Sequence, residues 1–282
     1  MAMREPRRAD LPGADSGSEA TVPGVPYQDL RVSGVRVEAY GTRSERRPPL
    51  LYVHGATQGS WAWENMAPWA AARGWYSACL NWFGHNGSDS LPERQAVRRH
   101  LTDVATEIGL VAGDLGRPPV IIAHSMGGLA SLAYAARHEV AALVLLVPAV
   151  PAAFAFEPID VPVEDPCSLW LPPLPMRAPV FWDKVSPEDA ERYSSLLAPE
   201  SPVIIEEGSR WTVSLDIGTV KVPAYVFAAE RDAIKATTLS QLAQSLGAKF
   251  TVLPGEGHGI PLNPVWQAVA AEIDDWLTGL FG

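Results

Sequence analysis

The chain has 282 residues, 47% of them hydrophobic and 19% charged, so it is long enough to bury one large core or two small ones. Its net charge of −10 disfavours nucleic acids and anionic membrane surfaces as partners. It holds two cysteines, and no apolar run approaches the ~18 residues that a membrane span needs. We therefore expect free thiols, a cytoplasmic protein, and a small molecule as the partner, with no prediction of oligomeric state.

The chain begins with a polar segment and continues with short apolar segments. Residues 1–26 are rich in Arg, Pro, Gly, Ser and Asp without periodicity, which predicts a flexible tail and no secretion signal of the usual kind. The segments typical of strands are residues 30–32, 35–39, 50–53, 76–82, 120–123, 141–147, 224–228 and 250–253. The segments with a helical pattern are residues 61–73, 94–115, 129–137, 187–197, 238–246 and 264–277, the last ending before Gly279.

Strands and helices alternate along most of the chain, which predicts a parallel sheet with crossover helices. The continuous apolar run at 141–147 is typical of a central strand that is covered on both faces. The alternation stops where prolines become dense and helical pieces become short. We therefore expect an α/β fold with a mostly parallel, doubly wound sheet. Its core would comprise residues 27–148 and 219–282, with an inserted, mainly helical cap at 149–218.

Ser125 stands where the strand at 120–123 meets the next helix. Residues 123–128 read Ala-His-Ser-Met-Gly-Gly, which is close to the pattern Gly-x-Ser-x-Gly, with Ala123 at the first glycine. A tight turn of this kind exposes one hydroxyl beside a helix N-terminus. The alternative is a serine that only caps a packed helix. We favour a nucleophile.

A serine hydroxyl needs a base to take its proton, and the base needs a carboxylate to orient it. Asp232 and His258 each follow a predicted parallel strand, at the sheet edge where ligands bind. The order Ser, Asp, His is the one found on this kind of sheet. We predict Ser125 as nucleophile, His258 as base on a loop that flanking glycines allow to bend, and Asp232 as the orienting acid. Glu230 remains an alternative acid.

The attack also needs donors for the developing oxyanion, and backbone N–H groups supply them on this kind of sheet. We predict the N–H of Met126, which follows the nucleophile, and that of Ala56 in the loop after residues 50–53. The cap is rich in aromatic residues, which favours an apolar or aromatic substrate. The predicted pocket residues are Thr57, Gln58, Trp61, His124, Trp170, Trp182 and Trp211.

The remaining histidines have structural interpretations. His54 and His85 are expected to brace loops, and His124 to pack under the turn or line the pocket. His100 and His138 are expected on solvent-facing helix positions. No pair has the spacing of metal ligands, so no metal ion is predicted.

Five short motifs lie in loops that follow predicted strands: Val53-His54-Gly55-Ala56, Gly84-His85-Asn86-Gly87-Ser88, His124-Ser125-Met126-Gly127-Gly128, Glu230-Arg231-Asp232 and Gly255-Glu256-Gly257-His258. With these motifs the chain resembles the α/β-hydrolase superfamily from about residue 30 to residue 280. The loop His54-Gly55-Ala56, followed by Gly59, Trp61 and Trp63, is similar to the plant methylesterase and hydroxynitrile-lyase branch and its bacterial relatives. The resemblance implies the triad Ser125, Asp232 and His258, no cofactor, and small ester substrates.

The chain departs from this branch at two positions. The lyases carry a lysine directly after the catalytic histidine, where this chain has Gly259, which argues against cyanohydrin cleavage. The branch often has a histidine where this chain has Gln58, so the polarity of the pocket is expected to differ.

The reading that these features favour is a serine hydrolase that cleaves a carboxylic ester through an acyl-enzyme. A carbon–carbon bond hydrolase is an alternative, with Arg177, Lys184 or Arg210 of the cap binding a substrate carboxylate. A thioesterase, or a cyclase or lyase of secondary metabolism, would use the same triad. A ligand-binding protein with an idle triad is a less favoured alternative.

Overall fold

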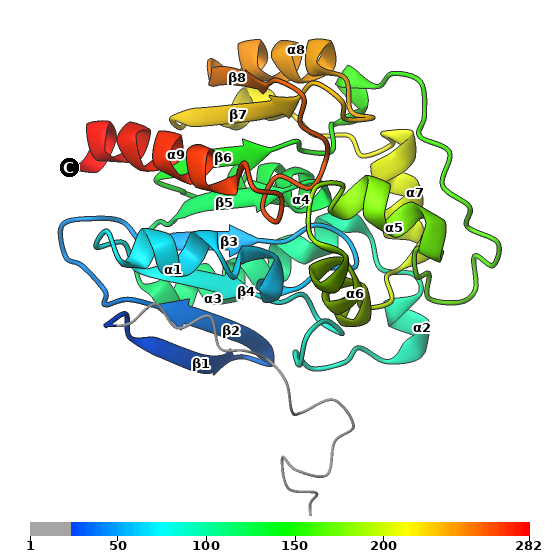
Figure 1. The fold of residues 1–282 in the computed structure, drawn as a ribbon, viewed down its shortest axis with the longest axis horizontal. Helices are drawn as coiled ribbons and strands as arrows, with labels where there is room; N and C mark the ends of the chain where they lie inside the picture. The colour runs from blue at the N-terminus through cyan, green and yellow to red at the C-terminus, as the bar shows by residue number, and fades with distance from the viewer. Residues whose placement is uncertain (1–23) are drawn as a thin grey trace, which may run out of the picture.

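A computed structural model describes residues 24–282, so residues 1–23 of the predicted tail (1–26) lie outside the described residues. Its centre is an eight-stranded sheet in the order β1-β2-β4-β3-β5-β6-β7-β8 (Figure 1). The strands are β1 Tyr27–Val32, β2 Val35–Tyr40, β3 Leu50–Val53, β4 Ser77–Leu80, β5 Val120–His124, β6 Ala142–Leu146, β7 Ala224–Ala229 and β8 Lys249–Leu253. β2 pairs antiparallel with β1 and β4, and all pairs from β4 to β8 are parallel. The predicted mostly parallel α/β sheet is confirmed.

Helices cover both faces of the sheet. They are α1 Met66–Ala71, α2 Glu93–Ala96, α3 Ala105–Leu115, α4 Met126–Ala135, α5 Leu174–Phe181, α6 Pro187–Leu196, α7 Pro202–Arg210, α8 Ala236–Leu246 and α9 Trp266–Phe281, with short 3₁₀ turns η2 Ser60–Trp63, η3 Leu101–Val104, η4 Ala152–Phe154 and η5 Ile217–Thr219. α1 and α9 lie on one face, and α3, α4 and α8 pack on the other (Figure 1). Among residues 24–282 no helix combines the length and apolarity of a membrane span.

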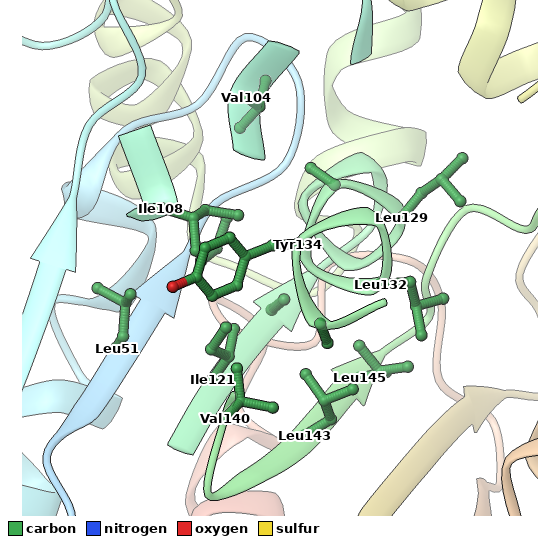
Figure 2. Close-up of a cluster of buried hydrophobic side chains, with 14 of the residues drawn as sticks. Leu51, Val104, Ile108, Ile121, Leu129, Leu132, Tyr134, Val140, Leu143 and Leu145 are labelled. Carbon is green, nitrogen blue, oxygen red and sulfur yellow. The ribbon is translucent and has the colours of Figure 1, made fainter. Parts of the chain in front are cut away.

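Each face of the sheet has its own apolar core. On one face, Leu132 and Tyr134 of α4 lie over the strands that carry Ile121 and Leu143 (Figure 2). Ile122, the next residue of β5, points into the other core, against α1 and α9. Because neighbouring residues of a strand point to opposite faces, a strand buried on both faces must be apolar throughout. This is why β5 and β6 are continuous apolar runs.

The chain between β6 and β7 carries α5, α6 and α7, which lie beyond the carboxyl ends of the strands (Figure 1). We call residues 149–218 the insert. Only one of its helices, α6, was expected, because dense prolines usually end helices. Here α5, α6 and α7 each have a proline in their first turn, where a missing N–H costs nothing. The boundaries of core and cap stay a prediction.

Residues 94–115 do not form the single helix that their apolar pattern predicts. The segment is divided into α2, η3 and α3, with an extended residue, His100 (φ −89°, ψ 155°), before η3. The predicted helix at 61–73 is likewise divided, into η2 and α1. At the other end of the chain, α9 continues through Gly279 to Phe281, so this glycine does not end the helix as expected.

Hydrogen bonds from the insert replace helical ones at the break before η3. The Ser201 hydroxyl lies 3.1 and 2.8 Å from the carbonyl oxygens of Val97 and Arg99, to which it donates. The Glu207 carboxylate accepts from the N–H of Leu101 at 2.8 Å. These partners lie about a hundred positions along the chain, so a local apolar pattern gives no sign of them.

Ser201→Ala should lower the free energy of unfolding by about 1–2 kcal/mol. The side chain is 1% exposed, bonds to both carbonyls at the break, and accepts from the N–H of Val203 at the start of α7. Urea denaturation measures the change, with Ser195→Ala on the exposed face of α6 as control. Equal midpoints for the two variants would contradict this assignment.

Candidate active site

Ser125 stands at the tip of the turn between β5 and α4, in a conformation that L residues rarely adopt (φ 54°, ψ −126°). Its N–H donates to the carbonyl of Leu146, and its carbonyl accepts from the N–H groups of Gly128 and Ala149. These bonds fix the strained residue between two parallel strands and the helix. The conformation aims the side chain away from the sheet edge, as the sequence motif predicts.

The structure brings His258 and Asp232 to this serine. His258 Nε2 lies 2.8 Å from Ser125 Oγ, and His258 Nδ1 lies 2.8 Å from Asp232 Oδ2. The Asp232 side chain is 2% exposed and that of His258 12%. Glu230, the alternative acid, accepts instead from the N–H of Gly255. Asp232, and not Glu230, is therefore the carboxylate that contacts His258, and three side chains from three separate strand ends form one hydrogen-bonded series.

The two predicted oxyanion donors lie at the same place. Ala56 and Met126 both line the cavity that Ser125 and His258 enter. Among the described residues neither N–H has a hydrogen-bond acceptor. Met126 begins α4, where backbone N–H groups have no partner within the helix. Two backbone N–H groups without acceptors thus belong to residues that line the cavity beside Ser125.

A cavity of about 160 Å³ opens beside Ser125 and His258. A cavity of about 150 Å³ holds a group the size of benzene. Its walls are mostly apolar and come largely from the insert. Phe181, one of the cap aromatic residues expected to line the entrance, does line the cavity. Apolar side chains that line it, and that the sequence did not single out, are Ile159, Val161, Met176, Val180 and Ile205.

Four of the predicted pocket residues line the cavity: Gln58, His124, Trp170 and Trp211. The other three do not, which corrects the expectation. Trp61 stacks on Tyr193 of α6, with ring centroids 5.6 Å apart, and Trp182 packs on the same tyrosine. Thr57 is fully buried, and its carbonyl accepts from the N–H of Ala198. The Trp61 ring and the Thr57 carbonyl thus join the core to the insert, whereas the contact of Trp182 with Tyr193 lies within the insert.

The three cap cations proposed to bind a substrate carboxylate also lie away from the cavity. Arg177 bonds to the Pro172 carbonyl and to Ser194, and Lys184 pairs with Glu256. Arg210 is exposed at the end of α7. Arg231, which the sequence analysis did not single out, does line the cavity, with its side chain 59% exposed.

His54 and His85 brace loops, as expected. His54 bonds to the Gly55 carbonyl and accepts from the N–H of Trp82, and burial with the nearby His85 lowers its pKa. His85 bonds to the Phe83 carbonyl. His100 and His138 are exposed, but neither lies within a helix, which corrects that part of the expectation. No group of metal-ligating side chains occurs within residues 24–282.

His85 also faces a buried carboxylate of the insert. Glu200 lies 3.3 Å from His85, and both side chains are 2% exposed. Burial alone would raise the pKa of Glu200, but His85 and the N–H of Ser201 stabilise the carboxylate and hold the pKa below its ordinary value. The backbone of Glu200 pairs with Trp170, a residue of the cavity wall. This contact therefore fixes one wall of the cavity to the core.

His124 links the turn to the loop that carries His258. Its Nε2 donates to the His258 carbonyl at 2.9 Å, and its Nδ1 lies 3.1 Å from the amide of Gln58. Gln58 in turn accepts from the N–H of Gly55. Burial, together with the neighbouring imidazole of His258, lowers the pKa of His124 to about 3. His124 is therefore neutral in the pH range in which a histidine can act as a base, and it adds no charge beside His258.

The glycines that flank His258 have a different role from the one expected. Neither Gly257 nor Gly259 adopts a left-handed conformation, so the loop does not need them in order to bend. A Cβ at Gly259 would lie 2.2 Å from the Phe181 carbonyl oxygen, and one at Gly257 would lie 3.1 Å from the Asp183 carboxylate. Both positions carry a glycine because the insert packs directly on them.

The comparisons with known proteins agree with this fold. The model of the alpha/beta hydrolase family matches residues 50–272, and the chain belongs to that family. It is a hydrolase by class, as the sequence motifs predict. The resemblance to the methylesterase and hydroxynitrile-lyase branch stays a prediction. No curated protein matches the sequence significantly.

Several solved structures share the fold at low sequence identity. A thermophilic esterase from Thermogutta terrifontis has a TM-score of 0.69 and 18% identity, over 91% of this chain and 100% of that one. The thioesterase domain from the curacin biosynthetic pathway has a TM-score of 0.65 and 16% identity, over 90% and 99%. A methylesterase from Arabidopsis has a TM-score of 0.64 and 16% identity, over 82% and 99%.

The low pKa of His124 predicts a pH dependence of stability. Below pH 6.5, the ordinary pKa of a histidine, His124 is protonated in the unfolded chain, whereas in the folded chain it stays neutral down to about pH 3. The free energy of unfolding therefore falls as the pH falls through this window. For one proton the slope approaches about 1.4 kcal/mol per pH unit. His124→Gln should reduce the slope, measured by urea denaturation from about pH 7.5 to about pH 5. An equal reduction in His138→Gln, at an exposed histidine, would contradict the assignment.

Proposed function

We propose that the protein is a serine hydrolase that cleaves the carboxylic ester of a small apolar or aromatic molecule through an acyl-enzyme. The observation that carries the proposal is the hydrogen-bonded series Ser125–His258–Asp232, which opens on an apolar cavity with two unoccupied backbone donors. The proposal needs no cofactor, because each group that ester hydrolysis requires is a residue of this chain.

In the acylation step, His258 Nε2 takes the proton of Ser125 Oγ while the oxygen attacks the ester carbonyl carbon. Asp232 holds the imidazole through Nδ1–H and stabilises the imidazolium. The carbonyl oxygen becomes an oxyanion, and the N–H groups of Ala56 and Met126 bind it. His258 then gives the proton to the leaving alkoxide, which departs as the alcohol and leaves Ser125 acylated.

In the second step, water attacks the acyl-enzyme. His258 now removes a proton from the water and later returns it to Ser125 Oγ, which releases the acid.

Since the cavity is small and mostly apolar, either the acyl or the alcohol part of the substrate has to fit a space suited to a small ring or short chain. Free thiols at Cys79 and Cys167 support a reducing, cytoplasmic setting for this enzyme.

A thioester would enter the same machinery, and substrate comparison separates it from an oxygen ester. The carbon–carbon hydrolase alternative loses Arg177, Lys184 and Arg210 as carboxylate ligands, since they do not line the cavity, but Arg231 does line it and could take that role. A cyclase or lyase of secondary metabolism and a ligand-binding protein with an idle triad remain as alternatives, and labelling of Ser125 by a serine-reactive probe would argue against the idle triad.

Ser125→Ala should reduce kcat for aryl esters by about 10³-fold or more, since the covalent step has no nucleophile. The protein should keep its fold, because alanine leaves the backbone bonds of the turn in place. Hydrolysis of a series of p-nitrophenyl esters of increasing acyl size measures the loss. A fluorophosphonate probe should label the wild-type protein at Ser125, located by peptide mass spectrometry, and should not label the variant. Unlabelled wild type, or activity retained in the variant, would overturn the proposed mechanism.

Gly208→Ala should narrow the substrate range. Gly208 lies in α7 against the nucleophile turn, and a Cβ there would lie 2.5 Å from Met126 Cε. Because a methionine side chain is flexible, it should shift into the cavity that both residues line. We expect kcat/KM for benzoyl esters to fall about tenfold relative to acetyl esters, since overpacking of this size costs about 1–3 kcal/mol.

The matched control is Gly113→Ala, a helix position in α3 with open space around its Cβ. Alanine favours a helix over glycine by about 1 kcal/mol, so neither variant should unfold for lack of helix propensity. An unchanged ratio of benzoyl to acetyl hydrolysis in Gly208→Ala would show that this contact does not shape the pocket.

A further inference from the structure

At the end of α5, residues 181–184 of the insert pack on the loop that carries His258. The carbonyl of Phe181 occupies the space of a side chain at Gly259, and the Asp183 carboxylate lies over Gly257. Trp182 Cα is 3.1 Å from the same Cβ position at Gly259. The insert therefore packs on the residue before and the residue after His258, so closely that a Cβ at either position would crowd it.

Asp183 makes polar contacts with the loops of both the base and the acid. Its Oδ1 accepts from Asn263 Nδ2 at 2.7 Å, and its Oδ2 lies 3.5 Å from Arg231 Nη2. Asn263 follows His258 by five residues, and Arg231 directly precedes Asp232. The Asp183 side chain is 14% exposed and Asn263 is fully buried, so water competes little for the first of these bonds.

Further bonds join the same three segments. The N–H of Lys184 donates to Asn263 Oδ1 at 3.3 Å, and Lys184 Nζ pairs with Glu256 at 2.7 Å. The carbonyl of Glu256 accepts from the N–H of Arg231 at 2.8 Å. The groups that face Asp183 thus include one cation, Arg231, and one neutral amide, Asn263, and they lie on the loops that position His258 and Asp232.

We propose that Asp183 is a positioning residue: it holds the loop of His258 in register with that of Asp232 and with Ser125. The inference rests on the proposed function. Both hydrogen bonds of His258, to Ser125 and to Asp232, measure 2.8 Å. Their lengths depend on where the loops that carry His258 and Asp232 lie, and Asp183 contacts both loops. A displacement of about 1 Å at such a centre costs about 10²-fold in rate. Asp183 does not line the cavity, so its loss should act on kcat and not on substrate binding.

The first test compares kcat and KM of three variants on one aryl ester. Asp183→Ala should lower kcat about 10- to 100-fold with KM within about twofold. Asp183→Asn should keep most of the activity, because its side-chain oxygen still accepts from Asn263. Asp160→Ala removes an exposed carboxylate elsewhere on the insert and should change neither constant. An unchanged kcat in Asp183→Ala, or a loss confined to KM, would overturn the inference.

A reciprocal exchange tests the same bond without leaving a cavity. Asn263→Asp alone sets two carboxylates against each other and should lower kcat at least about tenfold. In the double variant Asp183→Asn with Asn263→Asp the amide donates in the opposite direction, and kcat should return to within about threefold of the wild type. A double variant no better than Asn263→Asp would overturn the inference even if Asp183→Ala did not fold.

The rate of fluorophosphonate labelling at Ser125 separates this inference from the proposed function. A wild-type protein that is neither labelled nor active refutes the proposed function. If the wild type is labelled and active while Asp183→Ala is labelled at the same rate, only the positioning role is refuted. We expect slower labelling of Asp183→Ala and a wild-type rate in Asp183→Asn. When labelling is measured below the melting temperature of each variant, a loss of stability alone would not slow it.

Discussion

The rest of the site depends on one backbone constraint, the left-handed conformation of Ser125 between β5 and α4. A non-glycine residue there costs of order 1–3 kcal/mol and persists only where its surroundings hold it. Here the N–H and the carbonyl of Ser125 are both bonded, to the end of β6 and to the start of α4. The nearest residues are small for the same reason. A Cβ at Gly127 would lie 2.2 Å from the His54 carbonyl oxygen, so any larger side chain would push α4 away from the β3 loop.

The candidate site is assembled from such close contacts. Gly127 lies against the loop after β3 and Gly259 against the end of α5, and at each an added methyl group would meet a backbone carbonyl oxygen at 2.2 Å. Gly55 lies against the side chains of His124 and Ser125, which a methyl group there would crowd at 3.1 Å. This arrangement explains how groups that follow β5, β7 and β8 come within hydrogen-bond distance of one another. None of these three glycines has a positive φ. It is therefore the close approach of a neighbouring segment, and not backbone freedom, that requires a glycine at each position.

The sequence predicts the sheet and the placing of Ser125, Asp232 and His258 because both follow from local patterns. An apolar β-branched run marks a buried strand, and parallel strands bring their carboxyl ends to one edge. The wall of the cavity does not follow from such patterns. Trp61 and Trp182 look like pocket residues by type, yet their rings pack on Tyr193, whereas Met176 and Ile205 carry no signal that distinguishes cavity from core. The break before η3 does not follow from a local pattern either, because its hydrogen-bond partners are Glu207 of α7 and Ser201, which directly precedes that helix.

The contacts of the insert bear on how rate and specificity are related in this protein. An insert that only covers the cavity would contribute to substrate binding alone. Here the residues on one side of it, such as Met176 and Val180, line the cavity, while the segment after α5 packs on the loop of His258. The insert also bonds to the core through Arg192 and Tyr193, which share the carboxylate of Glu64. A change that reshapes the cavity by moving α5 therefore also moves the support of the proposed base. Turnover and substrate range are then coupled through the same few backbone contacts, whichever ester the cavity accepts.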